Sequence, residues 1–290
     1  MKLKVAVAGV PGAWSSERMR EALSEAGVES FVFSLGDCLH NLNSGEVTLD
    51  GASLADLDGL VVKKLAAQDD PTARLRLHLL RALERGGVRV FSTPAVIDRV
   101  MDRYSMNMRL LEAGLPLPVT YSVESANALE AACVALGRAV VKPVYTSKGR
   151  GMTIAQPGNT SAEGWSEGHG RCLVQEFVQS PGRDIGACVL GGRYIGAFYR
   201  VAAAGQWMTT TAAGGRYEPC ELSAEGIEVA TRAAAAFGLD YTIADLVETA
   251  DGFRIYEVSA FGGFRGLRDS SGFDVAAEYA NYIKKELQHP

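Results

Sequence analysis

Two carboxylates near the C-terminus, Asp245 and Glu257, are spaced so that they could share a cation. They lie in strand-like segments 243–249 and 253–259, which are separated by the sequence Ala-Asp-Gly at residues 250–252. A three-residue loop with glycine in the left-handed position is a favoured hairpin connection, and it sets Asp245 directly opposite Glu257. Opposed side chains have Cβ atoms roughly 5 Å apart, and like charges there repel unless a cation or a proton lies between them.

This register also places Thr249 opposite Phe253, and it puts Ser259 on the same face as Glu257. Two carboxylates and a hydroxyl are oxygen ligands of the kind that Mg²⁺ prefers, with Mn²⁺ as an alternative, and they leave room for phosphate oxygens. A solvated strand face is the competing interpretation. A loop of Asp251–Gly252 alone would shift the register and place the two carboxylates on opposite faces.

A second group of residues is basic and rich in glycine. Lys142 lies near the end of strand-like segment 139–143, and the loop 147–151 with Lys148 and Arg150 follows. Glycines let backbone N–H groups approach a phosphate, and the basic side chains add positive charge. The loop has no G-x-x-x-x-G-K-[ST] motif, so it is not a P-loop.

A third candidate is the apolar strand at residues 173–178, which is followed by Asp184. Backbone groups of such a strand could pair with a purine edge, and a carboxylate could hold ribose hydroxyls. An ordinary sheet strand followed by a surface loop explains the same residues equally well. The glycines at residues 9–12 lack the G-x-G-x-x-G spacing, so a Rossmann dinucleotide site is disfavoured.

Composition limits the classes of protein that the chain can belong to. The 290 residues are 47% hydrophobic, and the formal net charge is only −5, so neither nucleic-acid nor membrane attraction has compositional support. Five scattered cysteines without a C-x-x-C motif disfavour a disulfide framework and a structural zinc site. With no targeting segment at the N-terminus, we expect a cytoplasmic protein.

The N-terminal ninety residues alternate short apolar runs with amphipathic helical stretches, which predicts a parallel sheet covered by helices. The runs are 4–8, 31–33, 59–62 and 88–91, and the helices are 16–26 and 71–85. Thr93 and Pro94 then start one long helix that carries Arg103 and ends before Gly114. Further strands are expected at 139–143, 172–178, 185–190 and 194–200, with a helix at 224–237. The fold class is therefore α/β followed by α+β.

Taken together, these segments resemble the ATP-grasp superfamily, most closely its RimK-like branch of glutamate and amino-acid ligases. The resemblance covers nearly the whole chain, and it rests on the order and spacing of several short motifs. These are residues 14–23, 93–99, 115–120, the Lys142 strand with its glycine loop, 174–177, 184–185, 214–215, and 257–260 followed by Gly262 and Gly266.

The resemblance implies a pre-ATP-grasp domain over residues 1–93 and an ATP-grasp domain over 94–290. The latter would consist of a nucleotide-lid subdomain, 94–173, and a metal-binding subdomain, 174–290. Asp245, Glu257 and Ser259 would bind the metal, and Arg200 would face the transferring phosphate or the substrate. The residues implied for ATP are Arg103, Lys142, Ser147, Lys148, Gly149, Gly151, Glu176, Phe177, Val178, Asp184 and Thr210.

The sequence departs from the RimK-like pattern at three positions near this site. Ser259 replaces an asparagine, Gly186 stands where the branch often has an arginine, and Thr210 lies in a segment that usually carries an asparagine. These changes favour, as an alternative function, a nucleotide-binding regulator or scaffold with weakened catalysis. A phosphotransferase that acts on a hydroxyl would share the ATP half of the site.

The substrate side differs as well. The apolar run 201–204 follows Arg200 where glutamate ligases of the branch have basic residues, which disfavours a poly-glutamate acceptor. Arg265 and Arg268 suggest a substrate that brings its own carboxylate or phosphate, although exposed arginines are more often ordinary surface residues. We therefore predict an ATP- and Mg²⁺-dependent carboxylate–amine ligase that forms an amide through an acyl phosphate. Its partners would be a small-molecule or peptide carboxylate and an amine, with no nucleic acid or membrane, and it could form a homo-oligomer.

Overall fold

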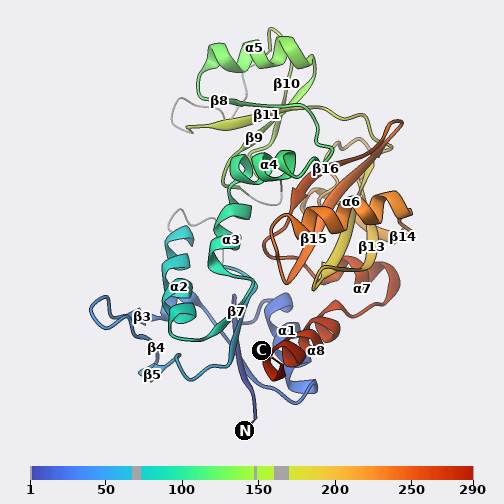
Figure 1. The fold of residues 1–290 in the computed structure, drawn as a ribbon. Helices are drawn as coiled ribbons and strands as arrows, with labels where there is room; N and C mark the ends of the chain where they lie inside the picture. The colour runs from blue at the N-terminus through green and yellow to red at the C-terminus, as the bar shows by residue number, and fades with distance from the viewer. Residues whose placement is uncertain (1, 67–72, 147–148, 160–169, 290) are drawn as a thin grey trace.

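The computed structural model describes residues 2–66, 73–146, 149–159 and 170–289. Its N-terminal part is built on a four-stranded parallel sheet of order β2-β1-β6-β7 (Figure 1). The strands are β1 (Lys4–Ala8), β2 (Glu29–Phe33), β6 (Gly59–Val62) and β7 (Arg89–Phe91). The predicted parallel sheet is confirmed, because each apolar run became a buried or half-buried strand.

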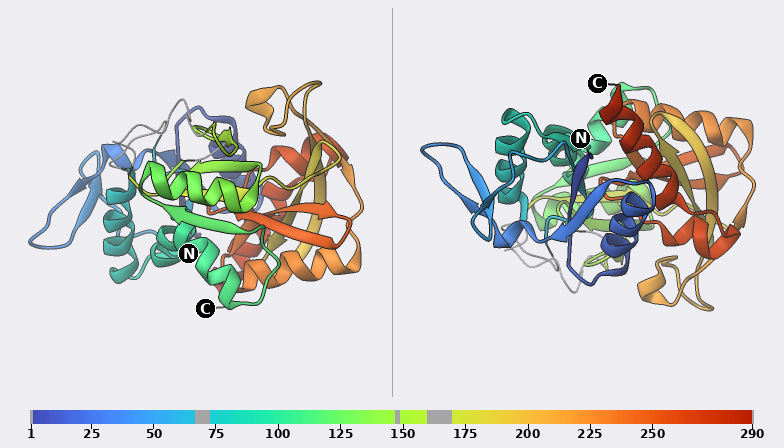
Figure 2. Two further views of the ribbon diagram at one scale, coloured as in Figure 1. Left: turned by 90° about the horizontal axis from the view of Figure 1, so that it is seen from above. Right: turned by 90° about the horizontal axis from the view of Figure 1, so that it is seen from below.

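Helices α1 (Trp14–Glu25) and α2 (Leu77–Arg85) cover opposite faces of this sheet. Val5 and Val7 pack on the α1 side, whereas Ala6 and Ala8 pack on the α2 side, as the two-residue period of a strand requires. Two short 3₁₀ helices, η1 (Leu35–Asp37) and η2 (Ala73–Arg76), lie in the connections. A small sheet of β3 (Leu39–His40), β4 (Val47–Leu49) and β5 (Ala52–Ser53) projects from one end (Figures 1 and 2).

The single helix expected after Thr93 is in fact two helices. The Thr93 hydroxyl accepts a hydrogen bond from Val96 N and caps α3 (Pro94–Met101), as predicted. Asp102 then leaves the helical conformation, and its carboxylate accepts hydrogen bonds from Tyr104 N and Ser105 N to cap α4 (Arg103–Glu112). The expectation of one helix was wrong because Asp102 starts a new one. Arg103 therefore lies in the first turn of α4.

An antiparallel sheet of order β10-β9-β11-β8 forms the upper part of the molecule in Figure 1. Helix α5 covers it, with Leu129 and Cys133 of that helix fully buried against the sheet. The elements are β8 (Thr120–Val123), α5 (Ala126–Leu136), β9 (Ala139–Pro143), β10 (Thr153–Ala155) and β11 (Cys172–Glu176).

A second antiparallel sheet, of order β14-β13-β12-β15-β16, carries the predicted metal residues. Helix α6 packs on it around a core that includes Ala230, Leu246 and Ile255. The strands are β12 (Arg183–Leu190), β13 (Arg193–Val201), β14 (Arg216–Cys220), β15 (Tyr241–Thr249) and β16 (Gly252–Val258). The helices are η3 (Thr211–Ala213), α6 (Ala224–Ala235), α7 (Arg265–Ser271) and α8 (Val275–Gln288).

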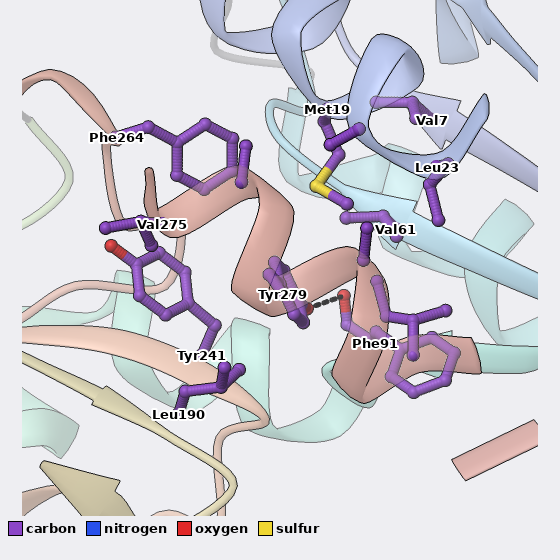
Figure 3. Close-up of a cluster of buried hydrophobic side chains, with 14 of the residues drawn as sticks. Val7, Met19, Leu23, Val61, Phe91, Leu190, Tyr241, Phe264, Val275 and Tyr279 are labelled. Atoms are coloured by element: carbon purple, nitrogen blue, oxygen red, sulfur yellow. Dashed lines mark hydrogen bonds between the residues drawn. The ribbon is translucent and has the colours of Figure 1, made fainter. Parts of the chain in front are cut away.

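The C-terminal helix α8 returns to the N-terminal sheet and packs beside α1. Figure 3 shows the resulting core, in which Tyr279 of α8 donates a hydrogen bond to the carbonyl of Phe91, at 3.5 Å. Met19 of α1 and Tyr241 of β15 join the same cluster. This core connects the two ends of the chain. The domain boundaries at residues 93 and 173 stay a prediction.

Candidate active site

The hairpin of β15 and β16 brings Asp245 opposite Glu257, but not through the loop that the sequence suggested. Thr249 pairs with Gly252 and not with Phe253, so only two residues connect the strands. A β-bulge between Asp245 and Leu246 then shifts the register by one residue, because Tyr256 on the facing strand is left unpaired. The bulge compensates for the shorter loop. The predicted pairing of the two carboxylates is therefore present, whereas the predicted register of the strand ends was wrong.

A buried guanidinium connects Asp245 to a second carboxylate. Asp184 and Arg200 face each other on β12 and β13, and the arginine donates to both oxygens of Asp184, from Nε at 3.1 Å and from Nη2 at 2.6 Å. Nη2 of Arg200 also lies 2.9 Å from Oδ2 of Asp245. Burial opposes the charge on Arg200, but the two carboxylates outweigh it and hold its pKa well above the ordinary value. The charges Asp184, Arg200 and Asp245 thus form one line across three strands.

One oxygen of Asp245 has no partner. Its Oδ1 is buried and accepts no hydrogen bond from any described residue. Burial raises the pKa of Asp245 to about 7, although Arg200 acts in the opposite direction. A buried carboxylate oxygen left unpaired is costly, and a divalent cation between it and Glu257 would remove that cost. Two carboxylates with the nearby Ser259 fit Mg²⁺, which takes few protein ligands. Among the described residues, no group of three His, Cys, Asp or Glu side chains has metal-binding geometry.

Arg103 lies on the other side of Glu257. It is 4% exposed, and its Nη2 is 3.5 Å from Oε2 of Glu257. Its Nη1 donates to the carbonyl of Pro143, at 2.7 Å, and to Oγ1 of Thr146, at 3.1 Å. The Arg103 side chain therefore connects the hairpin of β15 and β16 to the segment that leads from β9 into the glycine loop. Figure 1 shows α4, which carries Arg103, between the upper sheet and β16.

Lys142 is held by a residue that the sequence reading did not single out. Its ammonium donates to Oε1 of Gln175, and Nε2 of Gln175 donates to Oγ1 of Thr120 at 3.0 Å, which fixes the orientation of the amide. The ammonium also lies 5.1 Å from the ring centroid of Tyr256, the unpaired residue of the bulge. Burial, with a smaller contribution from Arg103, lowers the pKa of Lys142 to about 8, although Glu257 and Asp245 act in the opposite direction.

Part of the glycine loop can be described. Ser147 and Lys148 lie outside the described residues. Gly149 has φ +75°, and a Cβ there would meet Sδ of Met208 at 3.3 Å and Cγ2 of Thr210 at 3.5 Å. Gly151 has φ +67°, and a Cβ there would meet Cγ of Pro143 at 3.0 Å. Both positions need glycine, because their backbone lies in the left-handed region. The structure thus brings Thr210 against the loop.

The segment predicted to meet adenine, Glu176 to Val178, begins at the last residue of β11. Glu176 N donates to the carbonyl of Val119 at 2.8 Å, and Phe177 N donates to the carbonyl of Arg138 at 3.0 Å. The Phe177 ring lies 3.9 Å from the guanidinium of Arg138 and 6.4 Å from the ring of Trp207. Val178 is half-buried. Because both N–H groups are used within the protein, contacts to a base would come from carbonyls and side chains of this segment.

Arg265 and Arg268 both stack on Trp14. The guanidinium carbons lie 4.9 and 4.1 Å from the ring centroid, and Arg268 also pairs with Asp269 at 2.8 Å. Both arginines are exposed, and they belong to α7, which begins eight residues after Glu257. Their described contacts run to α1 and α7, not to the carboxylate hairpin.

Gly186 leaves no room for a side chain. Its added Cβ would lie 2.4 Å from Cζ of Phe198, and a Cβ on Gly266 would lie 2.2 Å from the same atom. Phe198 stacks edge-on against Tyr217, with 5.2 Å between ring centroids. The arginine expected at position 186 is therefore excluded by an aromatic ring packed between two glycines.

Lys63 was also missed. It directly follows β6, is 4% exposed, and donates a hydrogen bond of 2.6 Å to the carbonyl of Gly262. Burial lowers its pKa to about 7. In the sequence it reads as a polar residue at the end of a strand. Its one signal is the position after a buried strand of a parallel sheet, where ligands commonly bind.

Comparison with known families places this geometry among ATP-dependent enzymes. Residues 102–283 match the model of the RimK-like ATP-grasp domain. The tetrahydromethanopterin:alpha-L-glutamate ligase of Methanosarcina acetivorans is 32% identical over 314 aligned positions, which cover 96% of this chain and 97% of that protein. A probable alpha-L-glutamate ligase of Legionella pneumophila strain Corby is 25% identical, and the alignment covers 99% of this chain and 97% of that protein.

Solved structures agree in fold. The crystal structure of a RimK domain ATP-grasp protein from Sphaerobacter thermophilus superposes with a TM-score of 0.76 at 22% identity, and the match covers 96% of this chain and 98% of that one. The ATP-grasp ligase PsnB, solved with a minimal precursor, Mg and ADP, gives a TM-score of 0.74 at 20% identity, with 98% of each chain covered.

Proposed function

This chain belongs to the RimK-like ATP-grasp family and is a ligase that joins a carboxylate to an amine, and we propose that it uses L-glutamate as the amine and Mg²⁺ as the metal. The ATP-grasp fold, the family and the ligase class predicted from the sequence are confirmed. The glutamate assignment is supported by the names of the two relatives compared above, a tetrahydromethanopterin:alpha-L-glutamate ligase and a probable alpha-L-glutamate ligase.

The observation that carries the metal proposal is the buried, unpartnered Oδ1 of Asp245 opposite Glu257. Asp245, Glu257 and Ser259 would hold Mg²⁺, which when bound neutralises phosphate charge. Ser259 follows the last residue of β16, and its N–H donates to the carbonyl of Ile243, so its backbone is fixed beside the hairpin. The Ser259 side chain is shorter than the asparagine that the RimK-like pattern has at this position.

We assign the ATP phosphates to Arg103, Lys142 and the glycine loop. Arg103 and Lys142 approach the hairpin from the side of β9; Arg103 is buried and Lys142 is half-buried. Phosphoryl transfer is accelerated mainly by positioning and by cations that stabilise the spreading negative charge. Gln175 would act as a positioning residue, because its fixed amide holds the Lys142 ammonium in place.

Arg200 is proposed to meet the reacting carboxylate. In the described state it is committed to Asp184 and Asp245. A cation that takes over Asp245 would leave Nη2 of Arg200 available for a substrate oxygen. Asp184 would then orient the guanidinium, and its predicted contact with ribose hydroxyls remains a part of the proposal.

Several further assignments extend the same proposal. The nucleotide would be enclosed between the lid subdomain, 94–173, and the metal-binding subdomain, 174–290, with residues 1–93 as the pre-ATP-grasp domain. The apolar residues 201–204 after Arg200 favour an acceptor other than poly-glutamate. We also propose a cytoplasmic location: no disulfide joins the five cysteines, and within the described part of the chain no helix is both long and apolar enough to cross a bilayer.

Trapping of the activated acid tests the function. With ATP, Mg²⁺ and hydroxylamine, a panel of small-molecule and peptide carboxylates should yield a hydroxamate and ADP for the true acceptor, and L-glutamate should replace hydroxylamine to give an amide of the expected mass. A phosphate ester as product would instead indicate a phosphotransferase. ATP binding without ADP formation from any acid would favour the regulator or scaffold.

A further inference from the structure

Lys63 differs from Arg103, Arg200 and Lys142 in having no carboxylate close to it among the described residues. Arg103 has Glu257, Arg200 has two aspartates, and Lys142 lies in the field of Asp245 and Glu257. Among the described residues no carboxylate pairs with Lys63, and burial alone accounts for its lowered pKa. Its ammonium lies 3.7 Å from the ring centroid of Phe264 and 5.7 Å from that of Tyr241. Burying a cation without a counter-charge costs free energy. This cost suggests that an anionic ligand binds near Lys63.

The position of Lys63 in the sheet is that of a ligand site. In the strand order β2-β1-β6-β7, β2 lies on one side of β1, and the later strands β6 and β7 lie on the other. The point at which the strand order reverses is therefore between the carboxyl ends of β1 and β6. Ligands of open parallel sheets bind at such points. Lys63 directly follows β6, and Gly9 directly follows β1; a Cβ on Gly9 would lie 3.6 Å from Cβ of Lys63.

More positive charge reaches the same edge of the sheet from the C-terminal part. The carbonyl that Lys63 contacts belongs to Gly262, three residues after Ser259, and the chain continues through Phe264 into Arg265 and Arg268. Both arginines stack on Trp14 in the first turn of α1. We call Trp14, Lys63, Arg265 and Arg268 the Trp14 cluster.

The carboxylates near the Trp14 cluster do not balance its charge. Asp269 pairs with Arg268. Glu17, in the first turn of α1, accepts a hydrogen bond from Gly12 N at 2.9 Å and pairs with Arg20 at 3.0 Å. Among the described residues, Asp269 is thus the one carboxylate that pairs with a cation of the Trp14 cluster, and guanidinium groups are well suited to holding a further carboxylate in a bidentate contact.

We propose that the Trp14 cluster binds the distal carboxylate of the amine substrate, an amino-dicarboxylic acid. The arginines would contact the carboxylate, Trp14 would hold their planes in place, and Lys63 would add positive potential from the low-dielectric interior. The segment from Glu257 through Gly262 to Arg268 would connect the metal site to the substrate site. This inference rests on the proposed function, because it assigns a place to the amine of that reaction.

Calorimetric titration with L-glutamate and L-glutamine tests the Trp14 cluster. The two ligands differ only in the distal carboxylate. We expect L-glutamate to bind the protein, with and without a non-hydrolysable ATP analogue and Mg²⁺, about tenfold or more tightly than L-glutamine. Arg265→Gln and Arg268→Gln should each weaken L-glutamate binding about tenfold and leave L-glutamine unchanged. Lys63→Met should weaken it in the same direction, and Arg85→Gln, an exposed arginine of α2, should have no effect.

Equal binding of the two amino acids, wild-type affinity in both arginine variants, or no binding of L-glutamate would overturn the assignment. Failure of the ATP analogue to bind would instead contradict the proposed function. Because the amino acids are also titrated into the nucleotide-free protein, the Trp14 cluster is decided separately from the nucleotide site.

Discussion

The carboxylate hairpin and the Trp14 cluster handle charge in opposite ways. At the hairpin, cations and carboxylates alternate: Asp184 and Asp245 share Arg200, and Glu257 lies near Arg103. In the Trp14 cluster, Asp269 is the one described carboxylate that pairs with a cation, and the buried Lys63 ammonium contacts a backbone carbonyl and aromatic rings. The hairpin is nearly neutral within itself, whereas the Trp14 cluster has an excess of positive charge.

This difference indicates what each region is prepared to bind. A row of alternating cations and carboxylates can bind a metal ion and a polyphosphate together. The metal ion then replaces a cation beside a carboxylate, and the phosphate replaces a carboxylate beside a cation. An uncompensated cation cluster gains most from a ligand that is itself an anion. The comparison therefore supports the proposals that the hairpin binds the nucleotide and the metal and that the Trp14 cluster binds a substrate carboxylate.

Removing a hairpin carboxylate should have the largest effect. Asp245→Asn or Glu257→Gln takes away a proposed metal ligand, and we expect Mg²⁺-dependent ADP release to fall by about two to three orders of magnitude, in the range seen when one stabilising group is removed from an active site. Glu248→Gln alters an exposed carboxylate on the same strand and should leave the rate unchanged. Full activity in both hairpin variants would rule out the metal assignment.

The pH dependence of nucleotide binding separates the hairpin from the Trp14 cluster. The pKa of Lys142 is lowered to about 8, so its ammonium loses a proton as the pH rises through that value. Since phosphate favours the charged form, affinity for a non-hydrolysable ATP analogue should fall by up to about tenfold for each pH unit above 8, with proton uptake on binding. Lys142→Arg should give a flat profile between pH 8 and 10, above the pKa of about 7 of Asp245. A flat profile in the wild type would contradict this role of Lys142.

Phe198 packs between Gly186, which pairs with Asp245 on the neighbouring strand, and Gly266 of α7, and a methyl group at Gly186 tests that packing. The Cβ of Gly186→Ala would lie 2.4 Å from Phe198, so the ring must move or the strand must shift. We expect a loss of about 1–3 kcal/mol in the free energy of unfolding, as for other overpacked sites. Phe198→Leu in the same protein should recover part of it. Gly263→Ala, which has no heavy atom within 4 Å, is the control; equal stability of both alanine variants would refute the packing argument.

The smallest effect concerns the stability of the Trp14 cluster. The pKa of Lys63 is about 7 in the folded protein and 10.5 for an ordinary lysine. The unfolded chain therefore binds more protons between these values, so the free energy of unfolding should rise with pH in that window. From pH 7 to 9 we expect wild type to gain about 1–2 kcal/mol relative to Lys63→Met, measured by urea unfolding. Lys285→Met, at an exposed lysine, should behave as wild type; no difference for Lys63→Met would mean that Lys63 is not destabilised by burial.

Much of the fold could be read from the sequence because it depends on local patterns. The alternation of apolar runs and amphipathic helices gave the parallel N-terminal sheet, and the cap at Thr93 gave the start of α3. The break at Asp102 was missed, because a capping aspartate inside an otherwise helical pattern resembles an ordinary helical residue. The pairing of Asp245 with Glu257 was right although the loop was wrong, since the bulge at Tyr256 has no sequence signal of its own.

The parts of the candidate site that escaped prediction depend on long-range contacts. Gln175 matters because Thr120, 55 residues away, orients its amide toward Lys142. Lys63 matters because Gly262, 199 residues away, covers it. Conversely, Gly186 looked like the loss of an arginine from the site, whereas the structure shows a glycine required by Phe198. Neither kind of relation can be seen in the spacing of residues along the chain.

The central claim is that Asp245 and Glu257 hold Mg²⁺ for bound ATP. Calorimetric titration of a non-hydrolysable ATP analogue, with and without Mg²⁺, into wild type and Glu257→Gln tests it most directly. The account predicts micromolar binding in the wild type that weakens about tenfold or more when Mg²⁺ is removed, and no dependence on Mg²⁺ in the variant. Binding of equal strength with and without Mg²⁺, or the same dependence on Mg²⁺ in both proteins, would contradict it.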